Sequence, residues 1–177
     1  MDFALTDEQT AVFDMAKSFG SKHIAPFARQ WDKDGTIPKT LWRDIADLGF
    51  GGIYVSEESG GTGLSRLDAT LVFEALSASC ASVAAFLSIH NMCAKMIDSY
   101  GSDDLKSRIL TPALRMDTLL SYCLTEPGSG SDAASLKTRA SPTDDGYYLT
   151  GTKSFISGGG YSDAYIVMAR SGADGPK

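Results

Sequence analysis

The stretch YCLTEPGSGSDAAS, from Tyr122 to Ser135, decides the fold of this chain. It continues an apolar run, Leu119–Leu124, which predicts a strand. Pro127 ends the strand because proline has no N–H to donate to a sheet. The loop that follows consists of glycine and hydroxyl residues: Gly128, Ser129, Gly130 and Ser131. Since glycine adopts conformations closed to other residues, such a loop can direct backbone N–H groups and hydroxyls at an anion.

The nearest general motif is the G-x-G-x-x-G of dinucleotide-binding folds. Gly128 and Gly130 fit its first two positions, but Ala133 occupies the third. The motif also requires a helix to follow, whereas apolar and polar residues alternate over 136–140, as in a strand. A Rossmann fold is therefore rejected. A plain Ser/Gly surface turn between two strands stays open on these residues alone.

The segment Cys123–Ser135 meets every position of the first signature of the acyl-CoA dehydrogenases, and the chain resembles that family. The signature requires a glutamate, a glycine and an aspartate at fixed spacing, with small or hydroxyl residues around them. The resemblance extends over the chain through Glu57–Gly63 and Phe155–Gly158. Within the family, His90–Ala94 and Leu124–Leu136 are most similar to members that act on isobutyryl-CoA.

The resemblance implies an α+β fold, with an all-α helical domain over residues 1–118 and an incomplete β domain over 119–177. The periodicity of the residues agrees, since helical spacing comes first and strand-like runs follow. A further helical domain would complete the family fold, with FAD and acyl-CoA bound between the domains. The implied reaction is FAD-dependent α,β-dehydrogenation of a short, branched acyl-CoA thioester to the 2-enoyl-CoA. An electron-transferring flavoprotein would accept the electrons, and the full protein would be a homotetramer.

The resemblance also implies which residues bind the cofactor and the substrate. The implied cofactor contacts are Tyr122, Leu124 and Thr125 on the flavin ring, Gly130 and Ser131 on the pyrophosphate, and Phe155, Ile156 and Ser157 in a second flavin segment. Relatives often have Trp-Ile-Thr in this second segment, so Phe155 keeps an aromatic wall and Ser157 keeps a hydroxyl. The implied substrate contacts are Ser131 on the pantetheine chain and Ser88 and Met92 at the base of the acyl pocket, although ordinary helix packing also explains the last two.

The catalytic glutamate of the family lies in its C-terminal domain and matches no residue here, so no catalytic residue is assigned. Glu126 belongs to the binding signature and is not the base. Residues 1–177 alone are therefore expected to be inactive. A flavin monooxygenase or oxidase of the same fold, and a non-catalytic binding protein, stay open as alternatives.

Composition limits the partners, metal sites and cellular compartments that fit this chain. The net charge of −6 argues against a nucleic-acid partner, which needs a basic face. Three cysteines without C-x-x-C spacing predict free thiols in a reducing compartment, and two histidines without ligand-spaced partners predict no metal site. No apolar run reaches the roughly 18–20 residues of a membrane span, and the N-terminus shows no signal peptide. These features predict a bacterial cytoplasm or, for a processed form, a mitochondrial matrix.

Sequence patterns also predict the individual elements. A capping box, Thr6–Gln9, begins a helical stripe that reaches Phe27 and breaks near Pro26. Further helices are expected from Pro38 to Gly49, from Arg66, from a break at Cys80–Ser82 to Gly101, and from Ser102 with a bend at Pro112. Phe50–Val55 is expected to be extended, and Ser56–Gly63 is expected to be a loop. The expected strands are Leu119–Leu124, Leu136–Ala140, Tyr147–Thr150 and Tyr165–Ala169.

Overall fold

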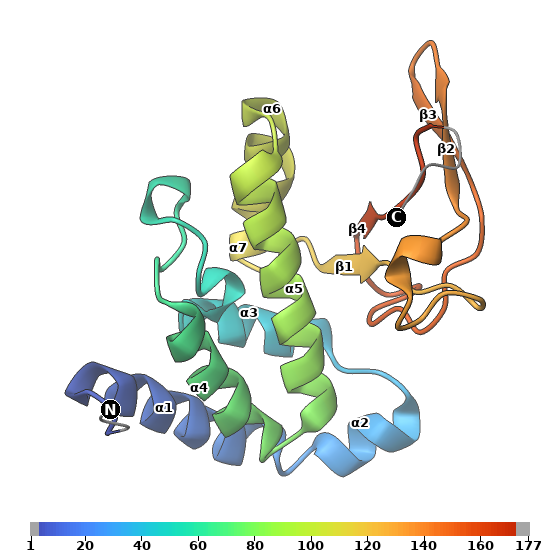
Figure 1. Cartoon of the computed structure of the whole chain (residues 1–177). Helices are drawn as coiled ribbons and strands as arrows, with labels where there is room; N and C mark the ends of the chain where they lie inside the picture. The colour runs from blue at the N-terminus through green and yellow to red at the C-terminus, as the bar shows by residue number, and fades with distance from the viewer. Residues whose placement is uncertain (1–3, 173–177) are drawn as a thin grey trace. The chain divides into compact units, whose positions relative to one another are not determined.

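The computed structural model describes residues 4–172, and the chain divides into two compact units, Met1–Leu119 and Leu120–Lys177. The first unit consists of helices, and all the strands in the described part of the chain belong to the second (Figure 1). The predicted α+β fold class is confirmed. Among residues 4–172, no helix is long and apolar enough to cross a bilayer.

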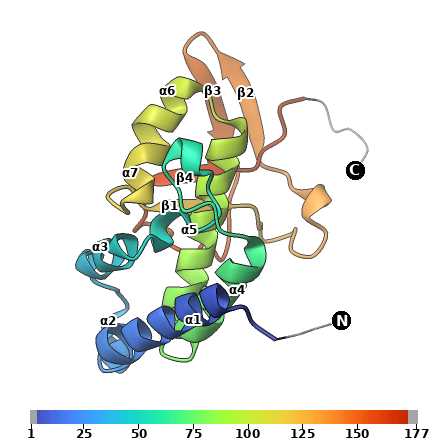
Figure 2. The same cartoon turned by 90° about the vertical axis from the view of Figure 1, so that its left-hand side faces the viewer.

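The first unit is built around one long helix, α5. Its elements are α1 (Asp7–Phe19), the π-helical η1 (Gly20–Ile24), α2 (Ala28–Asp34), α3 (Lys39–Asp47), the 3-10 turns η2 (Phe50–Gly52) and η3 (Glu57–Ser59), α4 (Arg66–Ser77), α5 (Ala81–Tyr100), α6 (Asp103–Leu105), the π-helical η4 (Lys106–Leu110) and α7 (Thr111–Leu114). Helix α4 lies between α1 and α5, and η2 and η4 pack against α5 (Figures 1 and 2). The largest fully buried side chains of this unit include Trp42, Phe50, Ile53, Leu76, Leu87 and Leu110.

The helix ends follow the predicted signals. Thr6 and Gln9 form both hydrogen bonds of a capping box, each 3.1 Å long. The first helical stripe breaks as predicted, because η1 and a turn at 25–27 separate α1 from α2. Pro38 is the N-cap of α3 instead of its first helical residue, and Gly49 follows the helix with φ 80°.

The prediction that Phe50–Val55 is extended is wrong, because this segment begins with the 3-10 turn η2. The tight backbone of η2 lies against α7: a Cβ added to Gly51 would stand 2.2 Å from the carbonyl oxygen of Leu114. The buried side chain of Asn91 on α5 holds the turn in place. Its Oδ1 accepts from Ile53 N at 2.7 Å, and its Nδ2 donates to the carbonyl oxygen of Phe50 at 2.8 Å. An apolar sequence pattern cannot reveal a turn that a distant amide fixes.

We predict that Asn91→Leu lowers the free energy of unfolding by about 2–4 kcal/mol, since each buried backbone group left unpaired costs about 1–3 kcal/mol. Urea unfolding followed by circular dichroism measures the loss. The matched control is Gln30→Leu, which removes an exposed amide from α2 and should change stability by about 0.5 kcal/mol or less. Equal effects of the two substitutions would contradict the anchoring role of Asn91.

Over residues 120–172, the described part of the second unit, the strands form two separate pairs. Strand β1 (Leu120–Cys123) pairs in parallel with β4 (Ala164–Val167), and β2 (Arg139–Thr143) forms an antiparallel hairpin with β3 (Gly146–Thr150). The first, third and fourth predicted strands are confirmed. The second is displaced, because β2 begins at Arg139 instead of Leu136. The backbone N–H groups of Lys137 and Thr138 bind a carboxylate, so these residues do not start the ladder.

Candidate functional site

The loop after β1 is organised by the carboxylate of Glu126, a buried residue. One oxygen accepts from Thr138 N at 2.9 Å and from Lys153 Nζ at 2.8 Å. The other oxygen accepts from Lys137 N at 2.6 Å. Glu126 therefore joins the loop after β1, the residues just before β2 and the segment after β3.

These hydrogen bonds also set the protonation state of Glu126. Burial acts to raise the pKa of this carboxyl, but the hydrogen bonds from Lys153, Thr138 and Lys137 outweigh it and lower the pKa to about 2. A general base needs a pKa nearer the working pH and a free lone pair aimed at its proton. Glu126 is thus ionised at neutral pH and serves as a structural acceptor, in keeping with its place in the binding signature.

Two clamps bring together the two segments expected to contact a flavin. Ser154 N donates to the carbonyl oxygen of Thr125 at 2.9 Å. At the other end, the buried Ser121 on β1 donates from Oγ to the carbonyl oxygen of Ser157 at 2.5 Å, and it lies 2.6 Å from Ser162 Oγ. Sequence analysis missed Ser121 and Lys153, because a serine in a strand and a lone lysine carry no motif.

Phe155 has the most unusual conformation among the predicted site residues. Its side chain is 96% exposed, and its φ is 57°, in the left-handed region that a bulky residue rarely adopts. Burial of the ring does not explain this conformation, and the backbone does not favour it either. Strain of this kind costs about 1–3 kcal/mol and is concentrated at ligand sites. The neighbouring Ile156 is half-buried and Ser157 is exposed.

The glycine and serine loop differs from expectation in two respects. Gly128 and Gly130 have no positive φ, and a Cβ added to either would meet no atom within 4 Å, so this chain's own packing does not require glycine there. Ser129 is buried, and its Oγ donates to the carbonyl oxygen of Asp132 at 2.7 Å, so this hydroxyl serves the loop instead of a ligand. The exposed Ser131 remains a candidate ligand donor. Open space over two glycines and an exposed hydroxyl suits a pyrophosphate that approaches the backbone closely.

The other predicted residues lie at the edge of an element or on one helix. Tyr122 on β1 is half-buried, as are Leu124 and Thr125 directly after it. Ser88 and Met92 are both half-buried on α5, one turn apart. The Ser88 hydroxyl donates to the carbonyl oxygen of Ala85 at 2.8 Å, as serines within helices often do.

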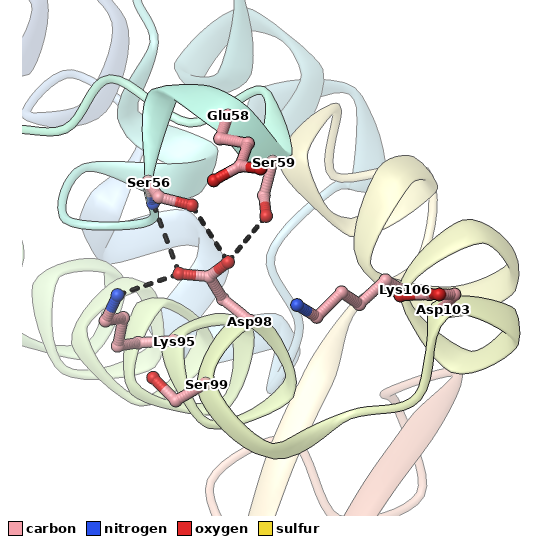
Figure 3. A pocket seen from close by; sticks show the side chains of 8 residues that line it. All are labelled: Ser56, Glu58, Ser59, Lys95, Asp98, Ser99, Asp103 and Lys106. Atoms are coloured by element: carbon pink, nitrogen blue, oxygen red, sulfur yellow. Dashed lines mark hydrogen bonds and ion pairs between the residues drawn. The ribbon is translucent and has the colours of Figure 1, made fainter.

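A polar pocket of about 450 Å³ in the first unit was not predicted from the sequence (Figure 3). Asp98 of α5 is one of its lining residues and accepts from Ser56 N at 3.3 Å, Ser56 Oγ at 3.0 Å, Ser59 Oγ at 2.6 Å and Lys95 Nζ at 2.7 Å. Burial raises the pKa of Asp98, but these hydrogen bonds outweigh it and hold the pKa well below its ordinary value of 3.8. Because both carboxylate oxygens are occupied, Asp98 anchors the loop around η3 to α5 and has no capacity left for a ligand.

We predict that Asp98→Asn lowers the free energy of unfolding by about 1.5–3 kcal/mol at neutral pH, since hydrogen bonds to a charged group are lost. A carboxyl whose pKa is depressed on folding stabilises the protein above its unfolded pKa. That contribution disappears as the pH falls from about 4 through the lower folded pKa.

Urea unfolding of wild type and variant at about pH 7 and about pH 3 should therefore show a gap that narrows in acid. Asp103→Asn, which alters an exposed carboxylate of the same pocket, is the control and should change stability by about 0.5 kcal/mol or less. A gap that stays constant with pH would contradict the anchoring role of Asp98.

Within the described residues, no group of three or more His, Cys, Asp or Glu side chains is placed to hold a metal ion. Cys93 and Cys123 are buried thiols, and Cys80 is a half-buried one. The buried His90 donates from Nε2 to the carbonyl oxygen of Ala113 at 3.0 Å. Burial lowers the pKa of His90 to about 4, so this histidine is a neutral core residue.

Comparison with known proteins identifies the family to which both units of this chain belong. Residues 6–117 match "Acyl-CoA dehydrogenase, N-terminal domain", and residues 121–177 match "Acyl-CoA dehydrogenase, middle domain". The chain belongs to the acyl-CoA dehydrogenase family.

Individual relatives and solved structures are similar to this chain over nearly its whole length. The chain is 52% identical over 174 residues to "Isobutyryl-CoA dehydrogenase, mitochondrial" of Dictyostelium discoideum, a match that covers 98% of this chain and 42% of the relative. The structure is similar to butyryl-CoA dehydrogenase from Megasphaera elsdenii, with a TM-score of 0.84, 38% identity and coverage of 96% of this chain and 45% of that one. It is also similar to the FAD complex of PigA, with a TM-score of 0.88, 28% identity and coverage of 99% and 47%. The chain therefore spans less than half the length of these relatives.

Proposed function

We propose that the protein containing this chain is an FAD-dependent dehydrogenase of short, branched acyl-CoA thioesters, with isobutyryl-CoA as the leading substrate. The observation that carries the proposal is Phe155, an exposed aromatic residue in a strained conformation, which directly follows the residue that binds Thr125 at the start of the loop with two open glycines. The similarity to a relative named isobutyryl-CoA dehydrogenase supports the acyl group, and the similarity to an FAD complex supports the cofactor.

In this proposal the chain's own residues bind and orient the two ligands. The segment Tyr122–Thr125 and the segment Phe155–Ser157 form the flavin-binding wall, and Gly130 and Ser131 bind the pyrophosphate. Ser131 also contacts the acyl-CoA, whereas Ser88 and Met92 limit the depth of the acyl pocket. The hydrogen bond between Thr125 and Ser154 keeps the two wall segments side by side before any ligand arrives. Such preorganisation lowers the cost of binding.

When bound, FAD supplies the hydride acceptor for the dehydrogenation. No residue of this chain matches the general base of the family, and the low pKa of Glu126 agrees with a binding role for that carboxylate. The proposed electron acceptor is an electron-transferring flavoprotein, and the proposed assembly is a homotetramer. The two locations that fit are a mitochondrion, as in the name of the Dictyostelium relative, and a bacterial cytoplasm.

The cofactor assignment predicts that the full encoded protein purifies yellow and that Ser131→Ala binds FAD or acyl-CoA more weakly. Losing one hydrogen bond to a charged group costs about 1.5–3 kcal/mol, or about 10- to 150-fold in affinity. Fluorescence titration of the apoprotein with FAD and isothermal titration with acyl-CoA measure the two affinities. Ser141→Ala, an exposed serine of the β2–β3 hairpin, is the control. A full-length protein that stays colourless and cannot be reconstituted with FAD would refute the proposal.

The substrate assignment predicts that Ser88→Leu shortens the acyl chain that the full enzyme accepts, because the added methyl groups occupy the space below the acyl group. The ratio of kcat/KM for isobutyryl-CoA to that for longer acyl-CoAs should rise about tenfold or more, since one buried methylene is worth about 1–3 kcal/mol of discrimination. FAD content should not change. Ser82→Leu places the same side chain on another face of α5 and should leave the ratio as it is. An unchanged substrate profile in Ser88→Leu would indicate ordinary helix packing.

A further inference from the structure

We propose that Lys153 is a positioning residue for the flavin site, acting through the backbone of the first wall segment. The inference rests on the proposed function, because it concerns how the wall of the FAD site is held in shape. Lys153 touches neither ligand in this account. Its ammonium sets where Leu124 and Thr125 lie relative to Phe155.

The contacts of the ammonium carry the argument. Lys153 Nζ donates to the carbonyl oxygen of Leu124 at 2.9 Å and to Glu126 Oε1 at 2.8 Å. The side chain of Lys153 is 12% exposed and that of Glu126 is 6% exposed, so water does not readily replace either bond. One ammonium therefore binds the backbone carbonyl before Thr125 and the side-chain carboxylate of the residue after it.

The main chain next to Lys153 completes the clamp. The following residue, Ser154, donates its N–H to the carbonyl oxygen of Thr125 at 2.9 Å. Phe155 comes next, with its strained φ of 57°. A strained residue keeps its conformation only where its surroundings over-determine it. Lys153 and Ser154 supply that constraint on the N-terminal side of Phe155, and the bond from Ser121 to Ser157 supplies it on the other side.

Charge balance makes the lysine necessary. Without the ammonium, Glu126 keeps two backbone N–H donors but stays buried without a counter-charge, and the carbonyl oxygen of Leu124 loses this buried donor. Removing one partner of a buried pair is far more disruptive than removing both. Lys137 offers a natural comparison, because it binds Glu126 with its backbone N–H while the residue itself is exposed.

The test uses the full encoded protein reconstituted with FAD and compares Lys153→Met, Lys153→Arg and the control Lys137→Met. The FAD dissociation constant, the visible circular dichroism of the bound flavin at saturating FAD and the Tm are measured for each. Lys153→Met should bind FAD about tenfold or more weakly and change the visible dichroism well below its Tm. Lys137→Met should match wild type in both, and Lys153→Arg should recover part of the FAD affinity because a guanidinium also donates to two acceptors.

The double variant Glu126→Gln with Lys153→Met guards against a failure to fold, since it leaves no buried unpaired charge. It should still show the altered dichroism, because the Leu124 carbonyl oxygen is no longer bound by the ammonium. A lower Tm with wild-type FAD affinity and wild-type dichroism, in either the single or the double variant, would show a merely structural role and overturn the inference. A wild-type protein that binds no FAD would instead refute the proposed function.

Discussion

The ion pair between Glu126 and Lys153 is the interaction on which the second unit depends. The strands among its described residues form two-stranded sheets, and the residues of the β2–β3 hairpin are almost all exposed. Such pairs of strands are marginal by themselves. The carboxylate of Glu126 binds two backbone N–H groups ahead of β2, and the ammonium of Lys153 binds the backbone after β1. Because these bonds join three separate stretches of chain, the loops keep one arrangement where the sheets alone would not fix it.

Much of the fold was predictable because it follows from local rules. The capping box at Thr6, the left-handed Gly49 after α3 and the break before α5 each depend on residues close in sequence. The errors occurred where a distant group decides the local structure. Asn91 fixes the turn at Phe50–Gly52 from another helix, and Glu126 displaces the start of β2. The π-helical segments η1 and η4 were missed because the apolar spacing is compatible with an ordinary helix.

In the candidate site, too, some residues were predictable from the sequence and others were not. The residues expected to touch FAD were predicted from a signature, since a ligand constrains residue types at fixed spacing. Ser121 and Lys153 were not found, although their hydrogen bonds hold the two wall segments together. A supporting residue has only to reach its partner, so its position in the sequence is free and its type is common. Ser129 is the opposite case, because its hydroxyl looked suited to a ligand and is used inside the loop.

The choice of a buried ion pair over an apolar contact has a physical reason in this unit. An apolar pair of similar size is often as stable as a buried salt bridge, so stability alone does not favour charge. Apolar side chains, however, cannot satisfy the backbone N–H groups of Lys137 and Thr138 or the carbonyl oxygen of Leu124. Each such group left unpaired and buried costs about 1–3 kcal/mol. The hydrogen bonds that Glu126 and Lys153 make to three backbone groups thus offset the free-energy cost of desolvating the pair. They also fix the directions of those groups, which an apolar contact does not.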